Sequence, residues 1–142
     1  MADTLAGEKA YPSCVATWGG EMFKIGAMYT RKEINAALGG SVQSYLPTKN
    51  GEVVAACLTK EYNPEAPKVI LIGKGPIIES AGRMLAQQLS PIPVFMKHAV
   101  NAWEYIEKYK TAGYITKPVE MEPYIKKSGR SDVVGVILLE KV

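Results

Sequence analysis

The chain has 142 residues, 47% of them hydrophobic and 22% charged, which excludes a disordered polypeptide and suits a single domain spanning residues 1–142. Its formal net charge of +3 permits contact with phosphates but excludes a dedicated nonspecific DNA coat. No apolar run approaches the ~18 residues of a membrane span, and the N-terminus lacks a charged and then apolar leader, so we expect a cytoplasmic protein without a membrane partner.

The first third of the chain is expected to begin irregularly. Met1–Ala10 is polar and small, without periodicity, and we expect it to be disordered. Two short strands are expected next, at Cys14–Trp18 and Glu21–Ile25, about a glycine turn.

A helix is predicted over Arg31–Leu38. Thr30-Arg31-Lys32-Glu33 matches a capping box, in which the threonine hydroxyl accepts from the Glu33 amide and the glutamate carboxylate reaches back. Gly39-Gly40 then ends the helix, since glycine readily takes the left-handed conformation of a helix C-terminus.

A β-hairpin and a loop are predicted after this helix. Ser41–Leu46 has a strand pattern, Asn50-Gly51 is a preferred pair for tight hairpin turns, and Glu52–Thr59 returns as the second strand. Tyr62–Pro67 contains two prolines and is expected to be a loop.

The stretch from Lys68 to Tyr109 is predicted to form the core of the domain. It reads as a buried strand, a glycine turn, an amphipathic helix, a second strand and an aromatic strand. In that order the segments are Val69–Ile72, Gly73-Lys74-Gly75-Pro76, Pro76–Leu89, Ile92–Lys97 and Asn101–Tyr109.

The last third is expected to end in a buried strand. Thr111–Pro123 predicts a loop with one strand, Met121–Lys127 a short helical turn, and Val133–Leu139 the final strand. Strands in runs with two flanking helices predict an α+β fold, with a curved mixed β-sheet or a partly closed barrel.

Catalytic and metal-binding patterns are missing from the sequence. His98 is the one histidine and has no paired cysteine, and Cys14 and Cys57 have the spacing of ordinary thiols in a reducing compartment. Gly73-Lys74-Gly75-Pro76 matches neither phosphate-loop pattern, so a plain strand-to-helix turn is favoured over a nucleotide site. We therefore expect no enzyme activity and no cofactor.

The aromatic residues mostly carry a polar group. Eight tyrosines and two tryptophans stand against two phenylalanines, a composition that suits half-buried sites where rings contact a ligand. Two interpretations stay open for Trp103, Tyr105 and Tyr109: packing residues on one sheet face, or part of a pocket in which a base stacks between rings.

Several short motifs resemble those of known modified-base readers. Ile92–Lys97 followed by Asn101–Tyr109 resembles the end of SRA-type and related PUA-like domains, although Glu107 stands where those domains have glycine. Tyr29-Thr30-Arg31, Leu38-Gly39-Gly40 and Asn63-Pro64-x-Ala66-Pro67 are similar to motifs of a reader-like domain found beside nucleases in bacterial restriction systems.

This resemblance implies a PUA-like curved barrel that binds DNA and reads a modified base by flipping it into an aromatic pocket. It also admits a separately encoded nuclease as a partner. The alternative is a small-ligand or protein-interaction domain without nucleic-acid binding. If a base is held, we expect Tyr29, Tyr45 and Trp103 to wall the pocket and Arg31 and Lys97 to lie at its mouth. Tyr105 completes the expected nucleic-acid-binding residues.

Overall fold

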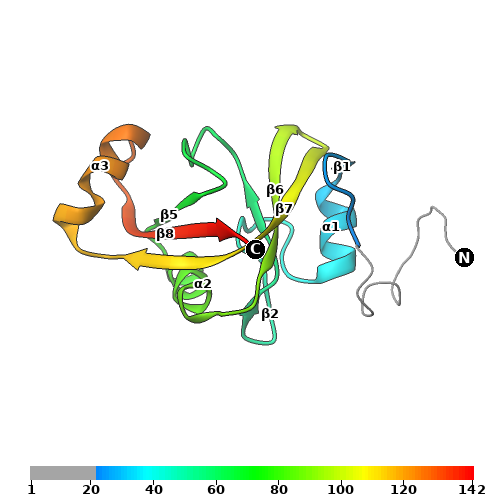
Figure 1. Ribbon diagram of the computed structural model, residues 1–142, viewed down its shortest axis with the longest axis horizontal. Helices are drawn as coiled ribbons and strands as arrows, with labels where there is room; N and C mark the ends of the chain where they lie inside the picture. Colours follow the sequence, from blue (N-terminus) through cyan, green and yellow to red (C-terminus); the bar gives the residue numbers. More distant parts are fainter. Residues whose placement is uncertain (1–21) are drawn as a thin grey trace, which may run out of the picture.

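The computed structural model describes residues 22–142, so the segment Met1–Ala10 and the expected strand Cys14–Trp18 lie outside the described residues. Within this part, no helix is long and apolar enough to cross a membrane. The elements follow one another along the chain as in Figure 1. They are β1 (Met28–Tyr29), α1 (Arg31–Leu38), β2 (Thr48–Lys49), β3 (Glu52–Val53), β4 (Ala56–Leu58), β5 (Val69–Gly73), α2 (Pro76–Gln87), β6 (Ile92–Ala99), β7 (Ala102–Ile115), α3 (Pro118–Ser128) and β8 (Val133–Lys141).

The main sheet is mixed and open. Its strand order is β4-β6-β7-β8-β5, with β1 added to β7, and β2 and β3 form a separate hairpin. β4 pairs with β6 in parallel, whereas β7 pairs antiparallel with β1, β6 and β8. β4 and β5 end the order without pairing with each other, so the sheet of the described residues does not close into a barrel.

The long strand β7 connects the two ends of the molecule. The half that starts at Ala102 pairs with β6, and the half that reaches Ile115 pairs with β8. The register with β6 shifts at Val94/Phe95, which is typical of a β-bulge that bends a strand. In Figure 1, α1 and α3 lie at opposite ends of the long axis with α2 between them.

Each helix packs into a hydrophobic cluster of its own. Ala81 and Leu85 of α2 belong to the largest cluster, with side chains from β4, β5, β6 and β8. Ile34 of α1 packs with the rings near the β6–β7 turn, and Met121 of α3 packs with β5 and β8. The core is thus distributed along the sheet, and the α1 end carries most of its aromatic side chains.

The local predictions around α1 and the hairpin are confirmed. The Glu33 N–H donates to Thr30 Oγ1 at 3.1 Å, and the Thr30 N–H donates to Glu33 Oε1 at 2.8 Å, which completes the capping box. Asn50 and Gly51 have φ of 54° and 79°, as a hairpin turn of the favoured type requires. The strand-to-helix turn after β5 and the final strand β8 also form where they were predicted.

Three predicted strands differ from the structure. Residues 41–46 form no strand, because the carbonyls of Ser41 and Ser44 accept hydrogen bonds from the Arg31 guanidinium. The predicted strand Glu52–Thr59 is divided into β3 and β4, since the Val54 N–H donates to Pro47 O at 2.9 Å between them. Residues 22–25, the described part of the expected strand Glu21–Ile25, are bends and turns.

The described residues contain three helices where two were predicted. α3 occupies a region in which a loop with one strand was expected up to Pro123 and a short helical turn over Met121–Lys127. Pro118 stands in the first turn, where its missing N–H needs no partner. Met121, Tyr124 and Ile125 then pack against β5 and β8, and Gly129 ends the helix in the left-handed conformation. Tertiary packing therefore outweighs the cost of Pro123 inside the helix.

The burial of Cys57 on β4 makes it an unreactive thiol. It is 1% exposed, and burial raises the pKa of its thiol to about 11. We expect a Cys14→Ser variant to resist alkylation by iodoacetamide at pH 8 until urea unfolds the chain, because the thiolate is the attacking species. Labelling is measured by mass spectrometry. Rapid labelling of the folded variant would contradict the burial of Cys57.

Candidate nucleic-acid interface

All the predicted site residues except Tyr45 lie together at the α1 end of the sheet. Tyr29 on β1 is the register partner of Trp103 on β7, and Lys97 on β6 is its partner from the other side. The Arg31 guanidinium carbon lies 5.4 Å from the centre of the Trp103 ring, and the Lys97 Nζ lies 5.6 Å from it. Both distances are in the range of cation–π attraction.

The aromatic rings at this end form a packed group, here called the aromatic cluster. It consists of Phe23, Tyr29, Phe95, Trp103 and Tyr105. Phe23 meets Tyr29 and Phe95 edge-on, with ring centres 5.0 and 4.9 Å apart. Trp103 is 7% exposed and Tyr105 is 2% exposed, so neither ring has an open face for a base to stack on. The Tyr29 hydroxyl accepts from the Lys24 N–H at 2.8 Å, which ties the chain before β1 to the cluster.

The two cations at the cluster differ in how they are held. Arg31 donates from Nε to Asn35 Oδ1 at 3.0 Å and from Nη2 to the carbonyls of Ser41 and Ser44 at 2.8 and 2.9 Å. It is therefore fixed in place while it holds the 41–44 loop. Lys97 is exposed and forms no ion pair within residues 22–142.

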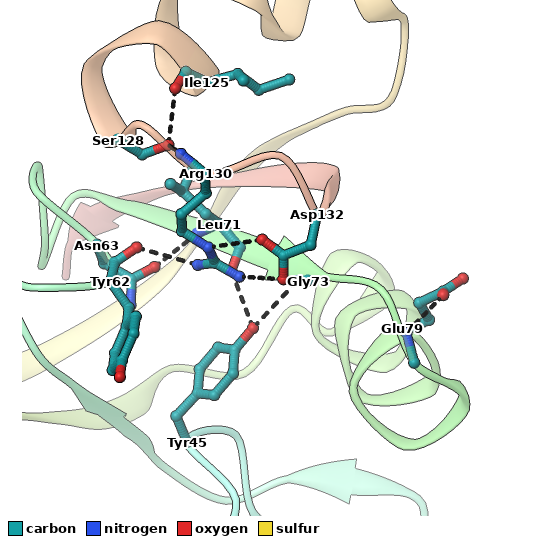
Figure 2. A network of polar contacts seen from close by, with 11 residues as sticks. Tyr45, Tyr62, Asn63, Leu71, Gly73, Glu79, Ile125, Ser128, Arg130 and Asp132 are labelled. Atoms are coloured by element: carbon teal, nitrogen blue, oxygen red, sulfur yellow. Dashed lines mark hydrogen bonds and ion pairs between the residues drawn. The ribbon is translucent and has the colours of Figure 1, made fainter.

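Tyr45 does not belong to the aromatic cluster. Its hydroxyl points into a second group of residues, shown in Figure 2 and here called the polar network (Tyr45, Gly73, Arg130 and Asp132). Its hydroxyl donates to Leu71 O at 2.9 Å and accepts from the Gly73 N–H at 3.3 Å. Arg130 forms a two-point contact with Asp132, at 3.0 and 2.9 Å.

The electrostatics of the polar network reflect this pairing. Burial raises the pKa of Tyr45, although the Gly73 hydrogen bond and the Arg130 charge lower it in part. The hydrogen bond from Arg130 lowers the pKa of Asp132 and raises that of Arg130. Arg130 also donates to the Tyr62 carbonyl at 3.0 Å, so the network joins loops that are distant in sequence.

No local sequence pattern predicted the roles of Arg130 and Asp132. Both lie in a polar loop before β8, and their contacts with Tyr45 arise only when the sheet brings β5 beside β8. Gly73 is the residue whose identity reflects these contacts. A Cβ there would lie 2.6 Å from Asp132 Oδ2 and 2.7 Å from Arg130 Nη2, so only glycine leaves room for the network.

The rest of the glycine turn serves the start of α2. The Gly75 N–H donates to Glu79 Oε2 at 2.9 Å, so the helix supplies its own carboxylate at the position that an anion would take. The lone histidine is also engaged, with His98 Nε2 2.7 Å from Glu104 Oε1. Within residues 22–142, no group of three histidine, cysteine or acidic side chains is placed to hold a metal ion.

We expect Gly73→Ala to lower the free energy of unfolding by about 1–3 kcal/mol, because the added methyl overlaps the Arg130–Asp132 pair. Gly113→Ala is the matched control, since a Cβ there meets its nearest atom, Leu138 Cδ1, at an ordinary 3.5 Å. Urea denaturation of both variants measures the difference. Equal losses in the two would show that the network does not restrict position 73.

Asp132→Asn should change the pH dependence of stability. The folded-state pKa of Asp132 is lowered, so its ionisation stabilises the fold above the unfolded pKa of about 3.9, and this contribution is lost as the pH falls through the lowered folded value. We expect the variant to melt below the wild type at pH 7 and to approach it in acid. Glu140→Gln, which breaks only the exposed pair with Lys110, is the control. A gap in melting temperature that persists unchanged at low pH would refute this.

Comparison with known proteins gives one informative match. No protein-family model matches the sequence, and no curated protein matches it. Among solved structures, the chain is similar to the SRA domain in the crystal structure of the SUVH5 SRA–hemimethylated CG DNA complex. The TM-score is 0.58 at 15% sequence identity, over 86% of this chain and 90% of that chain. The chain thus has an SRA-like fold, mixed α+β with an open sheet.

Proposed function

We propose that this chain is a DNA-binding domain that reads a modified base and has no catalytic activity of its own. The observation that carries the proposal is the fold, which matches 90% of an SRA domain crystallised with hemimethylated CG DNA. The motifs that resemble restriction-associated readers support a cytoplasmic role beside a separately encoded nuclease.

The distribution of ion pairs supports the α1 end as the surface that contacts DNA. Toward the other end, Lys126 pairs with Glu122 and Lys127 pairs with Glu65, while the exposed Lys117 before α3 has no ion pair within residues 22–142. At the α1 end, the exposed residues Lys24, Lys32 and Lys97 have no such pair among the described residues. Unpaired lysines can neutralise phosphates without first breaking a contact within the protein.

We place the base next to the 41–47 loop, which connects the two groups of candidate residues. Arg31 holds this loop by the carbonyls of Ser41 and Ser44, and the Tyr45 side chain at its other end enters the polar network. A base flipped out of the duplex would meet this loop between Arg31 and Tyr45. In this arrangement Arg31 and Lys97 contact the nucleic acid, and the rings of Tyr29, Trp103 and Tyr105 pack on the protein side of these two cations.

The test is a binding screen by fluorescence anisotropy over unmodified, hemimethylated, fully methylated and otherwise modified duplexes, each in a series of salt concentrations. We expect one modified duplex to bind more tightly than its plain counterpart, with affinity that falls steeply as salt rises. Absence of binding to every duplex at low salt would refute the proposal. An affinity that does not change with salt concentration would favour the alternative of an apolar interaction domain.

Lys97→Gln should weaken modified and plain duplexes alike and reduce the slope of log affinity against log salt by about one unit, as loss of one phosphate contact does. The control is Lys126→Gln, which removes a lysine already paired with Glu122 at the opposite end. An equal effect of both substitutions would argue against the α1 end as the DNA-binding surface.

A further inference from the structure

The Trp103 indole N–H is a buried donor without a hydrogen-bond acceptor. Trp103 is 7% exposed, and its Nε1 is the one buried side-chain polar atom of the described residues that has no partner. Buried donors of native proteins are nearly always paired, and leaving one unpaired costs free energy. An unpaired N–H beside a proposed binding surface suggests that an acceptor arrives with a ligand. Because the atom is buried, the exposed Lys97 side chain over the ring must move to admit that acceptor.

The surroundings of the indole specify the charge of that acceptor. Arg31 and Lys97 both lie within 6 Å of the ring centre, at 5.4 and 5.6 Å. Arg31 has its Nε and Nη2 occupied, whereas Nη1 forms no hydrogen bond within the described part of the chain. No carboxylate is paired with either cation there. The two cations and the indole N–H are all hydrogen-bond donors, so together they favour an acceptor with a negative charge.

We propose that Trp103, Arg31 and Lys97 form an anion site that takes a phosphate of a nucleic-acid backbone, with the indole N–H as one of its donors. The inference rests on the proposed function and specifies which part of the nucleic acid this site contacts. A phosphodiester oxygen accepts hydrogen bonds and carries the opposite charge. A base stacked on Trp103 fits less well, because the ring is buried and already faces the two cations.

Lys97 is the member of the site that can move. Its side chain is exposed and forms no hydrogen bond within the described residues, so it can turn toward an arriving phosphate at little cost. Arg31 stays fixed by Asn35 and the 41–44 loop. A phosphate bound by Arg31 would therefore lie close to the 41–47 loop, beside which we propose that the base is held.

Trp103 can report on the site directly by fluorescence. The chain has two tryptophans, so Trp18→Phe leaves Trp103 as the only one. We expect a single-stranded oligonucleotide of abasic sugar–phosphate units to shift the Trp103 emission as duplex DNA does. An uncharged deoxynucleoside should leave it unchanged. A response to the nucleoside and none to the abasic strand would overturn the phosphate assignment in favour of base stacking.

Two substitutions distinguish the contribution of the indole N–H to binding from that of the Lys97 charge. Trp103→Phe removes the N–H and keeps an aromatic ring, so we expect affinity for duplex DNA to fall by about 10-fold with an unchanged salt slope. Lys97→Met keeps the aliphatic stem and should reduce the salt slope by about one unit. Lys126→Met is the control for loss of an exposed lysine, since Lys126 lies at the opposite end and pairs with Glu122. Melting curves confirm that each variant is folded.

The outcomes distinguish this site from the proposed function. If duplex DNA binds but Trp103→Phe, correctly folded, binds as tightly as the parent chain, the anion site is wrong and the DNA-binding proposal stands. If no duplex binds while the abasic strand still shifts the Trp103 emission in a Lys97-dependent way, the anion site stands and the DNA-reader proposal falls. If neither ligand has an effect, both are wrong.

Discussion

The pairing of β7 with different strands along its length is the constraint on which the rest of the structure depends. The 14 residues from Ala102 to Ile115 bond first to β6 and then to β8, so one strand belongs to both ends of the sheet. This places α1 and the aromatic cluster beside the β6–β7 half and α3 beside the β8 half. A break in β7 would separate these ends, because no other strand pairs with both β6 and β8 in the described sheet.

The two ends of this sheet have different electrostatic characters. Around α3, Lys126, Lys127 and Arg130 are paired with carboxylates, whereas Lys117 is not paired within the described part of the chain, and Arg130 also contacts the Tyr45 hydroxyl. Around α1, Lys97 and Arg31 lie against the Trp103 ring and have no acidic partner in the described residues. Internal pairing therefore stabilises one end, while the other retains charge that a polyanion can neutralise. The 41–47 loop links them, since Arg31 holds it and Tyr45 extends from it.

The motifs that resemble modified-base readers have clear structural roles here. Thr30 caps α1, and Gly40 has φ of +82° with no room for a Cβ beside Pro47. The buried Asn63 side chain accepts from the Leu71 N–H at 2.8 Å and so fixes the loop before β5. Such residues specify backbone geometry. One of these motifs also contributes Arg31, whose guanidinium carbon lies 5.4 Å from the centre of the Trp103 ring.

The sequence by itself determined the features that depend on neighbours within a few residues: the capped helix α1, the Asn50-Gly51 turn, the glycine turn before α2 and the apolar strand β8. It also placed Arg31, Lys97, Trp103 and Tyr105 on the helix and the two strands that carry them in the structure. Only the tertiary structure decided that the rings of Trp103 and Tyr105 are buried, that Tyr45 faces Arg130, that the sheet stays open and that α3 forms despite Pro123. Caps and turns are stabilised by local hydrogen bonds, whereas burial, strand order and cation placement arise from contacts between distant segments that no short pattern encodes.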